Sequence, residues 1–151
     1  MEQEILYDKK ISLMLWKISN IWQIILRREL KKFSLTLNEY IILETLFFLK
    51  NTNITTQTNL SKSSGVDTSV VSTILKVLDR KKLVKRKVDS DNRKKNIKLT
   101  SEAISLLNKI IPVIKNIEDI FFSKLGNEQI NFFNSLRLIL AKKIRIKAER
   151  N

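Results

Sequence analysis

Two adjacent groups of side chains in the middle of the chain have the types and spacing needed to bind a polyanion. The first group is small and polar and recurs at helical spacing, which places its members along one face of a predicted helix over about 68–82. The second is the segment 76–98, which holds eleven Lys and Arg against three Asp, or +8 of the net charge of +14. Small hydroxyl side chains beside dense positive charge can approach both bases and phosphates of a nucleic acid. The residues of the first group are Thr68, Ser69, Ser72, Thr73 and Lys76.

The elements that precede these residues favour DNA binding over an ordinary solvated surface. Thr56 can cap a short helix at 57–63, and Gly65 supplies the positive φ that a turn between two helices requires. With Asp67 or Thr68 capping the next helix, the segment has the layout of a helix-turn-helix, whose second helix enters the major groove. Because this helix pair occurs together with a basic hairpin, we interpret the hydroxyl face as the surface that contacts DNA bases.

The basic hairpin is predicted directly after the second helix. Residues 83–88 alternate apolar and basic side chains, DSDN at 89–92 has the composition of a turn, and 93–99 is the returning strand. An arginine at the tip, Arg93, can reach a narrow minor groove, and the neighbouring Asp89 and Asp91 can aim its guanidinium. The residues predicted to contact DNA from the wing or along the backbone are Thr56, Arg80, Lys85, Lys87, Asn92, Arg93, Lys94 and Lys95.

Amphipathic helices are predicted on both sides of the hairpin and of the short helix pair. The stripes at the two ends of the chain contain Trp16, Trp22, Phe132 and Phe133, which one small core has little reason to need. Since monomers avoid large exposed apolar patches, we expect two copies of the chain to pair through these helices. The expected helices are 5–32, 37–49 with Ser34 or Thr36 as its cap, 100–123 with a kink at Pro112, and 127–148 after Gly126. Ile54 and Thr55 could form a very short strand.

The motif-bearing segment 60–100, LSKSSGVDTSVVSTILKVLDRKKLVKRKVDSDNRKKNIKLT, resembles the MarR family of winged-helix transcription regulators, and the likeness covers essentially the whole chain. The D-x-R at Asp91–Arg93, followed by K-x-I-x-L-T at 95–100, is similar to the wing signature of that family. The run L-x-x-K-x-L-V-x-R from Leu78 to Arg86 is similar to it as well.

The resemblance implies a mainly α fold with a small β-hairpin wing. It implies a single domain over 1–151, in which a winged helix-turn-helix core at 36–99 is flanked by dimerisation helices at 1–33 and 101–151. It also implies a homodimeric, sequence-specific regulator of transcription, most often a repressor in this family, that binds a pseudo-palindromic operator in double-stranded DNA.

The chain departs from the family pattern at three positions. Lys82 stands where the family usually has Gly, so the turn into the first strand must be made by a residue with a side chain. Ala103 and Asn92 likewise replace a frequent Gly and a frequent second Arg.

Small molecules often bind between the dimer helices and the DNA-binding part in this family. Here Trp16, Trp22 and Tyr40 could line such an effector crevice, although we favour their being core aromatics.

Composition excludes several other functions. The chain has no His and no Cys, which removes the commonest general base, the commonest transition-metal ligand and any thiol chemistry. Two Gly and one Pro argue against a Gly-rich phosphate loop, so we expect no enzyme, no cofactor and no metal site. No apolar run approaches the roughly 18 residues of a membrane span, and no signal peptide is present, so we expect a cytoplasmic protein with no membrane partner. The alternative left open is a nucleoid- or plasmid-associated DNA-binding protein with weak sequence preference.

Overall fold

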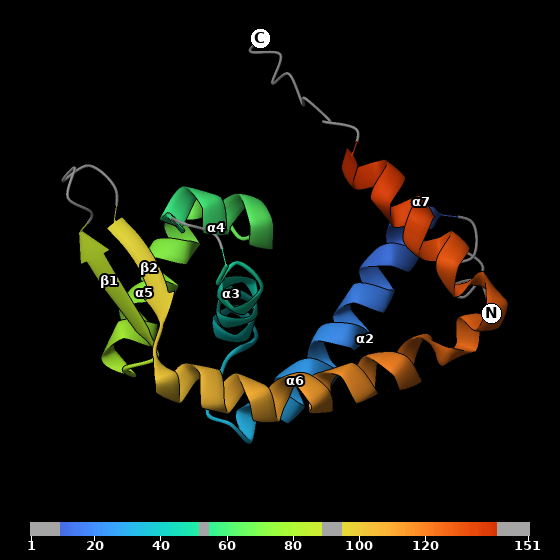
Figure 1. Ribbon diagram of the computed structural model, residues 1–151. Helices are drawn as coiled ribbons and strands as arrows, with labels where there is room; N and C mark the ends of the chain where they lie inside the picture. Colours follow the sequence, from blue (N-terminus) through green and yellow to red (C-terminus); the bar gives the residue numbers. More distant parts are fainter. Residues whose placement is uncertain (1–9, 52–54, 89–94, 142–151) are drawn as a thin grey trace, which may run out of the picture. The chain divides into compact units, whose positions relative to one another are not determined.

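The computed structural model describes residues 10–51, 55–88 and 95–141, which form helices and one antiparallel hairpin (Figure 1). The chain divides into two compact units, Met1–Ile114 and Lys115–Asn151, and helix α6 runs from the first into the second. The fold is therefore mainly α with a two-stranded hairpin, as the sequence predicted. The elements are α2 (Ile11–Lys31), α3 (Leu37–Phe48), α4 (Gln57–Ser64), α5 (Thr68–Arg80), β1 (Val84–Val88), β2 (Lys95–Leu99), α6 (Ser101–Phe122), the 3-10 helix η1 (Ser123–Glu128) and α7 (Gln129–Ala141).

Helix α3 lies at the centre of the first unit and begins at one of the two predicted caps. The Thr36 hydroxyl accepts the Glu39 N–H at 3.2 Å, and the Glu39 carboxylate accepts the Thr36 N–H at 3.1 Å. This reciprocal pair satisfies two backbone donors that the first turn leaves without partners. The Glu39 carboxylate is buried and also forms an ion pair with Lys81 Nζ at 2.8 Å. The contact ties the start of α3 to the end of α5.

Helices α4 and α5 form the predicted helix pair around Gly65. Thr56 caps α4 by accepting the Asn59 N–H at 3.2 Å, and Gly65 has a φ of +74°. Of the two candidate caps for α5, Asp67 is the one observed. Helix α5 buries one face in the core through Val71, Ile74, Leu75 and Leu78.

Helix α5 ends at Arg80, two residues before the predicted limit, because the chain turns there into β1. Lys82 has a φ of +59°, so a non-glycine residue does occupy the left-handed position of this turn. The strands pair in antiparallel register from Val84 opposite Leu99 to Val88 opposite Lys95. The described part of the returning strand begins at Lys95, and the predicted strand residues 93–94 lie outside the described residues.

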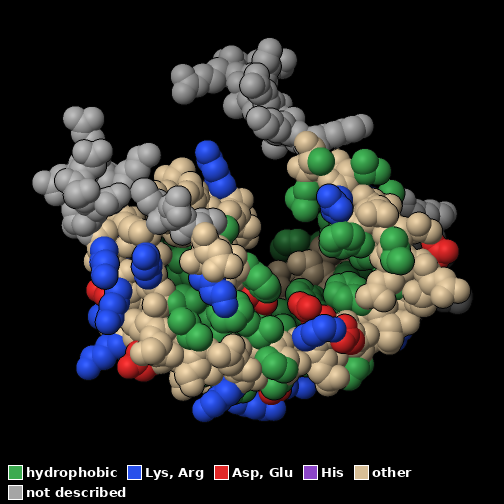
Figure 2. Space-filling model, in the orientation of Figure 1, with side chains coloured by type: hydrophobic (Ala, Val, Ile, Leu, Met, Phe, Trp, Pro, Cys, Tyr) green, Lys and Arg blue, Asp and Glu red, His purple; other side chains and the backbone are tan. Residues whose placement is uncertain are grey.

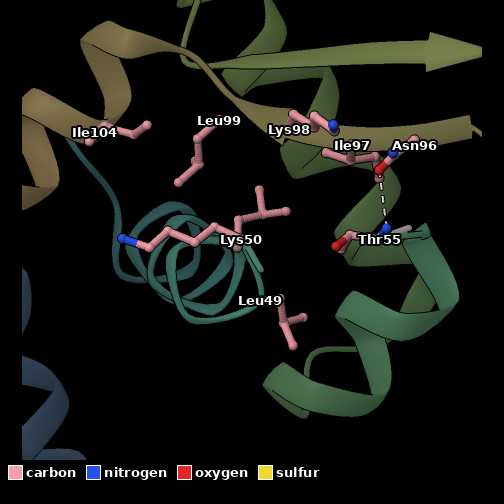
Figure 3. A pocket seen from close by; sticks show the side chains of 9 residues that line it. Leu49, Lys50, Thr55, Asn96, Ile97, Lys98, Leu99 and Ile104 are labelled. Carbon is pink, nitrogen blue, oxygen red and sulfur yellow. Dashed lines mark hydrogen bonds between the residues drawn. The ribbon is translucent and has the colours of Figure 1, made fainter. Parts of the chain in front are cut away.

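The hairpin is attached to the helix pair through Thr55, which lies just before α4. Thr55 was predicted to form a short strand with Ile54, but the structure assigns it no strand, and Ile54 lies outside the described residues. Its carbonyl oxygen accepts the Ile97 N–H at 2.9 Å, and its own N–H donates to Asn96 Oδ1 at 3.1 Å (Figure 3). Two hydrogen bonds therefore fix β2 against the loop that leads into α4.

Helix α6 begins after Thr100, as predicted, and continues through Pro112. The Thr100 hydroxyl accepts the Ala103 N–H at 3.2 Å and donates to the Lys82 carbonyl at 2.9 Å. Leu107, Ile110 and Ile114 are buried, so the compact unit that contains the predicted 36–99 core also includes the first half of α6.

The second unit contains the end of α6, η1 and α7. Gly126 has a φ of +52° between the predicted helices, and no described residue of η1 or α7 is buried.

Candidate nucleic-acid interface

The polar face of α5 is formed by the residues that the sequence placed there. Thr68, Ser69, Thr73 and Lys76 are exposed and Ser72 is half-buried, whereas the opposite face packs into the core. Val70 lies on the flank between the two faces and is 38% exposed. The exposed surface at the start of α5 is therefore mostly hydroxyl groups, with one apolar side chain beside them.

Cations surround this helix on its C-terminal side and on the hairpin. The predicted Arg80, Lys85, Lys87 and Lys95 are all exposed, and Figure 2 shows the Lys and Arg side chains gathered over the hairpin. Lys85 and Lys87 point away from the core because the buried Val84 fixes the alternation of β1. The hairpin thus presents a positively charged surface next to the hydroxyl face.

Two further cations of the segment 76–98, Lys81 and Arg86, differ from these exposed side chains in how they are placed against the rest of the fold. Lys81 is bound to Glu39 and donates to the Ser34 carbonyl at 2.8 Å, so its charge is compensated within the fold. Arg86 is half-buried, and its Nε and Nη2 atoms have no hydrogen-bond partner among the described residues. Charge density alone could not separate these two from the other cations, because Lys81 depends on the position of Glu39 beside the end of α5, and Arg86 depends on the face of β1 that it occupies.

Several predicted contacts remain predictions. Asp89, Asp91, Asn92, Arg93 and Lys94 lie outside the described residues. Thr56, also predicted to contact DNA, uses its hydroxyl oxygen to cap α4.

Hydrogen bonds within the helix pair fix the side chains at the start of α5. The Asp67 carboxylate accepts both the backbone N–H and the hydroxyl of Ser69, and these bonds lower the pKa of Asp67 below its usual value. The Thr68 hydroxyl lies 3.1 Å from Ser61 Oγ, and Gln57 Nε2 donates to the Thr68 carbonyl at 3.1 Å. Sequence reasoning identified Asp67 as a possible cap but assigned no role to Gln57 or Ser61. Their position opposite Thr68 depends on how the Gly65 turn folds α4 back.

A small hollow lies where α3, β2 and the start of α6 meet. Its volume is about 140 Å³, and Figure 3 shows Lys50, Lys98 and Ile104 around it with the Thr55–Asn96 hydrogen bond at one side. Lys50 Nζ lies 4.2 Å from the centre of the Phe47 ring, a cation–π contact that orients its charge toward α3.

The three aromatic residues predicted as a possible effector crevice have different surroundings. Tyr40 is 2% exposed and donates its hydroxyl hydrogen to Glu44 Oε1 at 2.7 Å, so it is a core aromatic as favoured from the sequence. Trp22 is half-buried, and Trp16 is 66% exposed on α2.

The described residues contain no group of three or more His, Cys, Asp or Glu that could hold a metal ion. Among the helices of the described ranges, none is long and apolar enough to cross a membrane.

The helix pair, the turn at Gly65 and the adjoining hairpin together define a winged helix-turn-helix protein. No family model matches the chain. It is 24% identical over 129 residues to an uncharacterised HTH-type transcriptional regulator, YdcH, of Bacillus subtilis strain 168, with 84% of this chain and 87% of that protein covered.

Solved structures match over most of the chain. The S. aureus MepR–DNA complex is 26% identical to it, covers 89% of this chain and 96% of that chain, and has a TM-score of 0.78. A MarR family transcriptional regulator from Silicibacter pomeroyi shares the fold at 22% identity, with 90% of both chains covered and a TM-score of 0.77. The chain is thus similar over most of its length to winged helix-turn-helix transcriptional regulators, among them a member of the MarR family.

Proposed function

We propose that this protein is a sequence-specific transcriptional repressor that binds a pseudo-palindromic operator as a homodimer. The observation that carries the proposal is the exposed hydroxyl face of α5 together with the exposed cations of the hairpin, whose first strand contacts α5. A reading helix needs small polar groups at base edges, and its docking needs cations at phosphates. Figure 2 shows the cations over the hairpin, and the similarity to MepR, which was solved in complex with DNA, supports the assignment.

The homodimer is supported by apolar surface that each unit leaves uncovered. On α2, Ile11 is 86% exposed and Leu15, Ile21 and Ile24 are exposed as well. In the second unit, an apolar hollow of about 340 Å³ is lined mainly by Phe122, Leu125, Ile130, Phe132, Phe133 and Leu136. Burying such surfaces between two copies would remove them from water and set two α5 helices about one turn of DNA apart.

Repression with release by a small molecule remains part of the proposal. The residues that support it are two aromatic side chains on α2, the exposed Trp16 and the half-buried Trp22. The site of action would be the cytoplasm, where the operator DNA lies.

Selection from random DNA followed by direct titration tests the function. We expect enrichment of one inverted repeat, bound far more tightly than random DNA of the same length. Equal affinity for all sequences would contradict the proposal and favour the nucleoid- or plasmid-associated alternative. Sedimentation at micromolar concentration tests the dimer separately, because a species of 17.7 kDa would be the monomer.

A further inference from the structure

The hydrogen-bond directions at the start of α5 carry an inference about which bases it contacts. It rests on the proposed function and specifies the chemistry of one contact within it. A hydroxyl has one hydrogen to donate and two lone pairs that accept. If the hydrogen is already used inside the protein, the hydroxyl can only accept from DNA.

For Ser69 and Thr73, the direction of the hydroxyl's hydrogen bond follows from its partner, because that partner is an oxygen that can only accept. The Ser69 hydroxyl lies against Asp67 Oδ1, and an ionised carboxylate can only accept, so Ser69 is the donor. The Thr73 hydroxyl lies 3.3 Å from the Ser69 carbonyl oxygen, which also can only accept, so Thr73 is the donor there. The hydrogen bonds from Ser69 hold the pKa of Asp67 below its usual value, so the carboxylate stays ionised at neutral pH.

A third direction follows from a chain of two bonds. Ser61 Oγ lies 2.7 Å from the Val66 carbonyl, and this bond uses the single hydroxyl hydrogen of Ser61. The 3.1 Å contact between Thr68 Oγ1 and Ser61 Oγ must then be donated by Thr68. Thr68, Ser69 and Thr73 can therefore only accept hydrogen bonds from outside the protein, and Ser69 is in contact with the Asp67 carboxylate.

We propose that Asp67, with Thr68 and Ser69, forms an acceptor-only surface that selects amino bases over keto bases at one position of each half-site. In the major groove, cytosine N4 and adenine N6 are donors, whereas guanine O6 and N7 and thymine O4 are acceptors. Acceptors on the protein favour cytosine or adenine on the strand they face and disfavour guanine or thymine. Phosphate oxygens also only accept, so the same surface is unsuited to the DNA backbone.

Asp67 becomes a specificity-determining residue in this arrangement. Its carboxylate lies on a helix that must approach a polyanion, where a negative charge weakens binding to any sequence. The charge is compatible with DNA binding only where it faces a base that donates. Lys76 lies further along the helix and keeps its donors for other positions.

The test is a selection from random DNA with the full-length protein, its Asp67→Asn variant and an Asp79→Asn control. Asparagine keeps the capping oxygen, so α5 still begins at the same place, but it adds a donor and removes the charge. Asp79 is an exposed residue near the other end of α5, and its replacement changes the net charge equally.

We expect the wild-type motif to contain one position per half-site that accepts cytosine or adenine and rejects guanine and thymine. Asp67→Asn should lower that discrimination by about tenfold and leave or raise the affinity for random DNA. Asp79→Asn should keep the amino-base preference. As a second measurement, replacing the selected adenine by purine, or the selected cytosine by 2-pyrimidinone, removes only the amino group. This should weaken the wild type more than Asp67→Asn.

The outcomes separate the inference from the function. A specific motif that is unchanged in Asp67→Asn overturns the inference and leaves the proposed function standing. A preference that changes but discriminates purine from pyrimidine, rather than amino from keto, overturns it as well. If wild-type protein enriches no motif, the proposed function fails and the inference fails with it.

Discussion

The polar face of α5 and the basic hairpin adjoin one another but differ in the chemistry they present to DNA. On α5, hydroxyls at fixed orientation dominate, and Lys76 is the one cation of the predicted reading set. On the hairpin, Lys85, Lys87 and Lys95 are exposed, and none of them forms an ion pair with a described residue. Fixed hydroxyls offer direction at short range, whereas lysines offer charge without direction.

This difference assigns the two contributions to binding to separate elements. Contacts to phosphates position the protein on any duplex, whereas contacts to base edges discriminate between sequences. The hairpin should therefore control affinity and its salt dependence, and α5 should control discrimination. The predictions below test that separation.

The largest effect is expected from salt. If 6–10 phosphates are neutralised, affinity should fall by about 10³–10⁵ between 50 and 200 mM salt, with a log–log slope of order −5 to −9. Replacing Lys85, Lys87 and Lys95 together by Ala should make the slope less steep by about three, for operator and random DNA alike. A titration series at four salt concentrations measures both slopes. A wild-type slope near −1 would mean that the hairpin does not contact the backbone.

The next effect is expected at the tip of the hairpin, from the sequence alone. Arg93→Ala should weaken operator binding by about 1–3 kcal/mol, and by more where the flanking DNA is A·T-rich and its minor groove narrow. Competition titrations with A·T-rich and G·C-rich flanks measure this. Unchanged affinity on both DNAs would mean that Lys94 or Lys95, and not Arg93, makes the contact with the minor groove.

The sequence predicted the positions of elements better than the orientation of side chains. Gly65, the cap at Thr56 and one of the two caps offered for α3, Thr36, are local patterns, and the structure confirms them. The end of α5 was misplaced by two residues, since only the resemblance to the family, and not the residue type, marks the turn at Lys82. Gly usually stands at such a position, and Lys has no special tendency to adopt it.

The chemistry of the site was predictable only in part. The spacing of Ser69, Ser72 and Thr73 places them along one helix face, but it contains no information on where each hydroxyl hydrogen points. That depends on Ser61 and Asp67, which the turn brings into contact with α5.

A smaller effect is expected from the hydroxyls of α5. Ser72→Ala or Thr73→Ala should reduce the discrimination between operator and random DNA by about 1 kcal/mol, with the salt slope unchanged. Lys95→Ala is the matched contrast, because it should weaken both DNAs equally and change the slope by about one. Titration of both DNAs at two salt concentrations compares the variants directly. If all of them weaken both DNAs in the same ratio, α5 does not read sequence and the separation of roles is wrong.

The smallest effect is expected at Lys82, where the two regions join. A left-handed φ of +59° is unfavourable for a residue with a Cβ, and Gly adopts it without that cost. Lys82→Gly should therefore stabilise the fold by roughly 0.5–1 kcal/mol, after allowing for the extra freedom of Gly in the unfolded chain. The same change removes an exposed cation beside the hairpin, so DNA affinity should fall slightly for every sequence.

Lys82→Ala separates the two causes, because it removes the charge and keeps the strained turn. Urea unfolding should then show a gain for Gly over Ala, while titrations with random DNA show equal losses. Equal stability of the two variants would mean that the turn holds its left-handed residue without measurable cost, and that only the charge at this position matters.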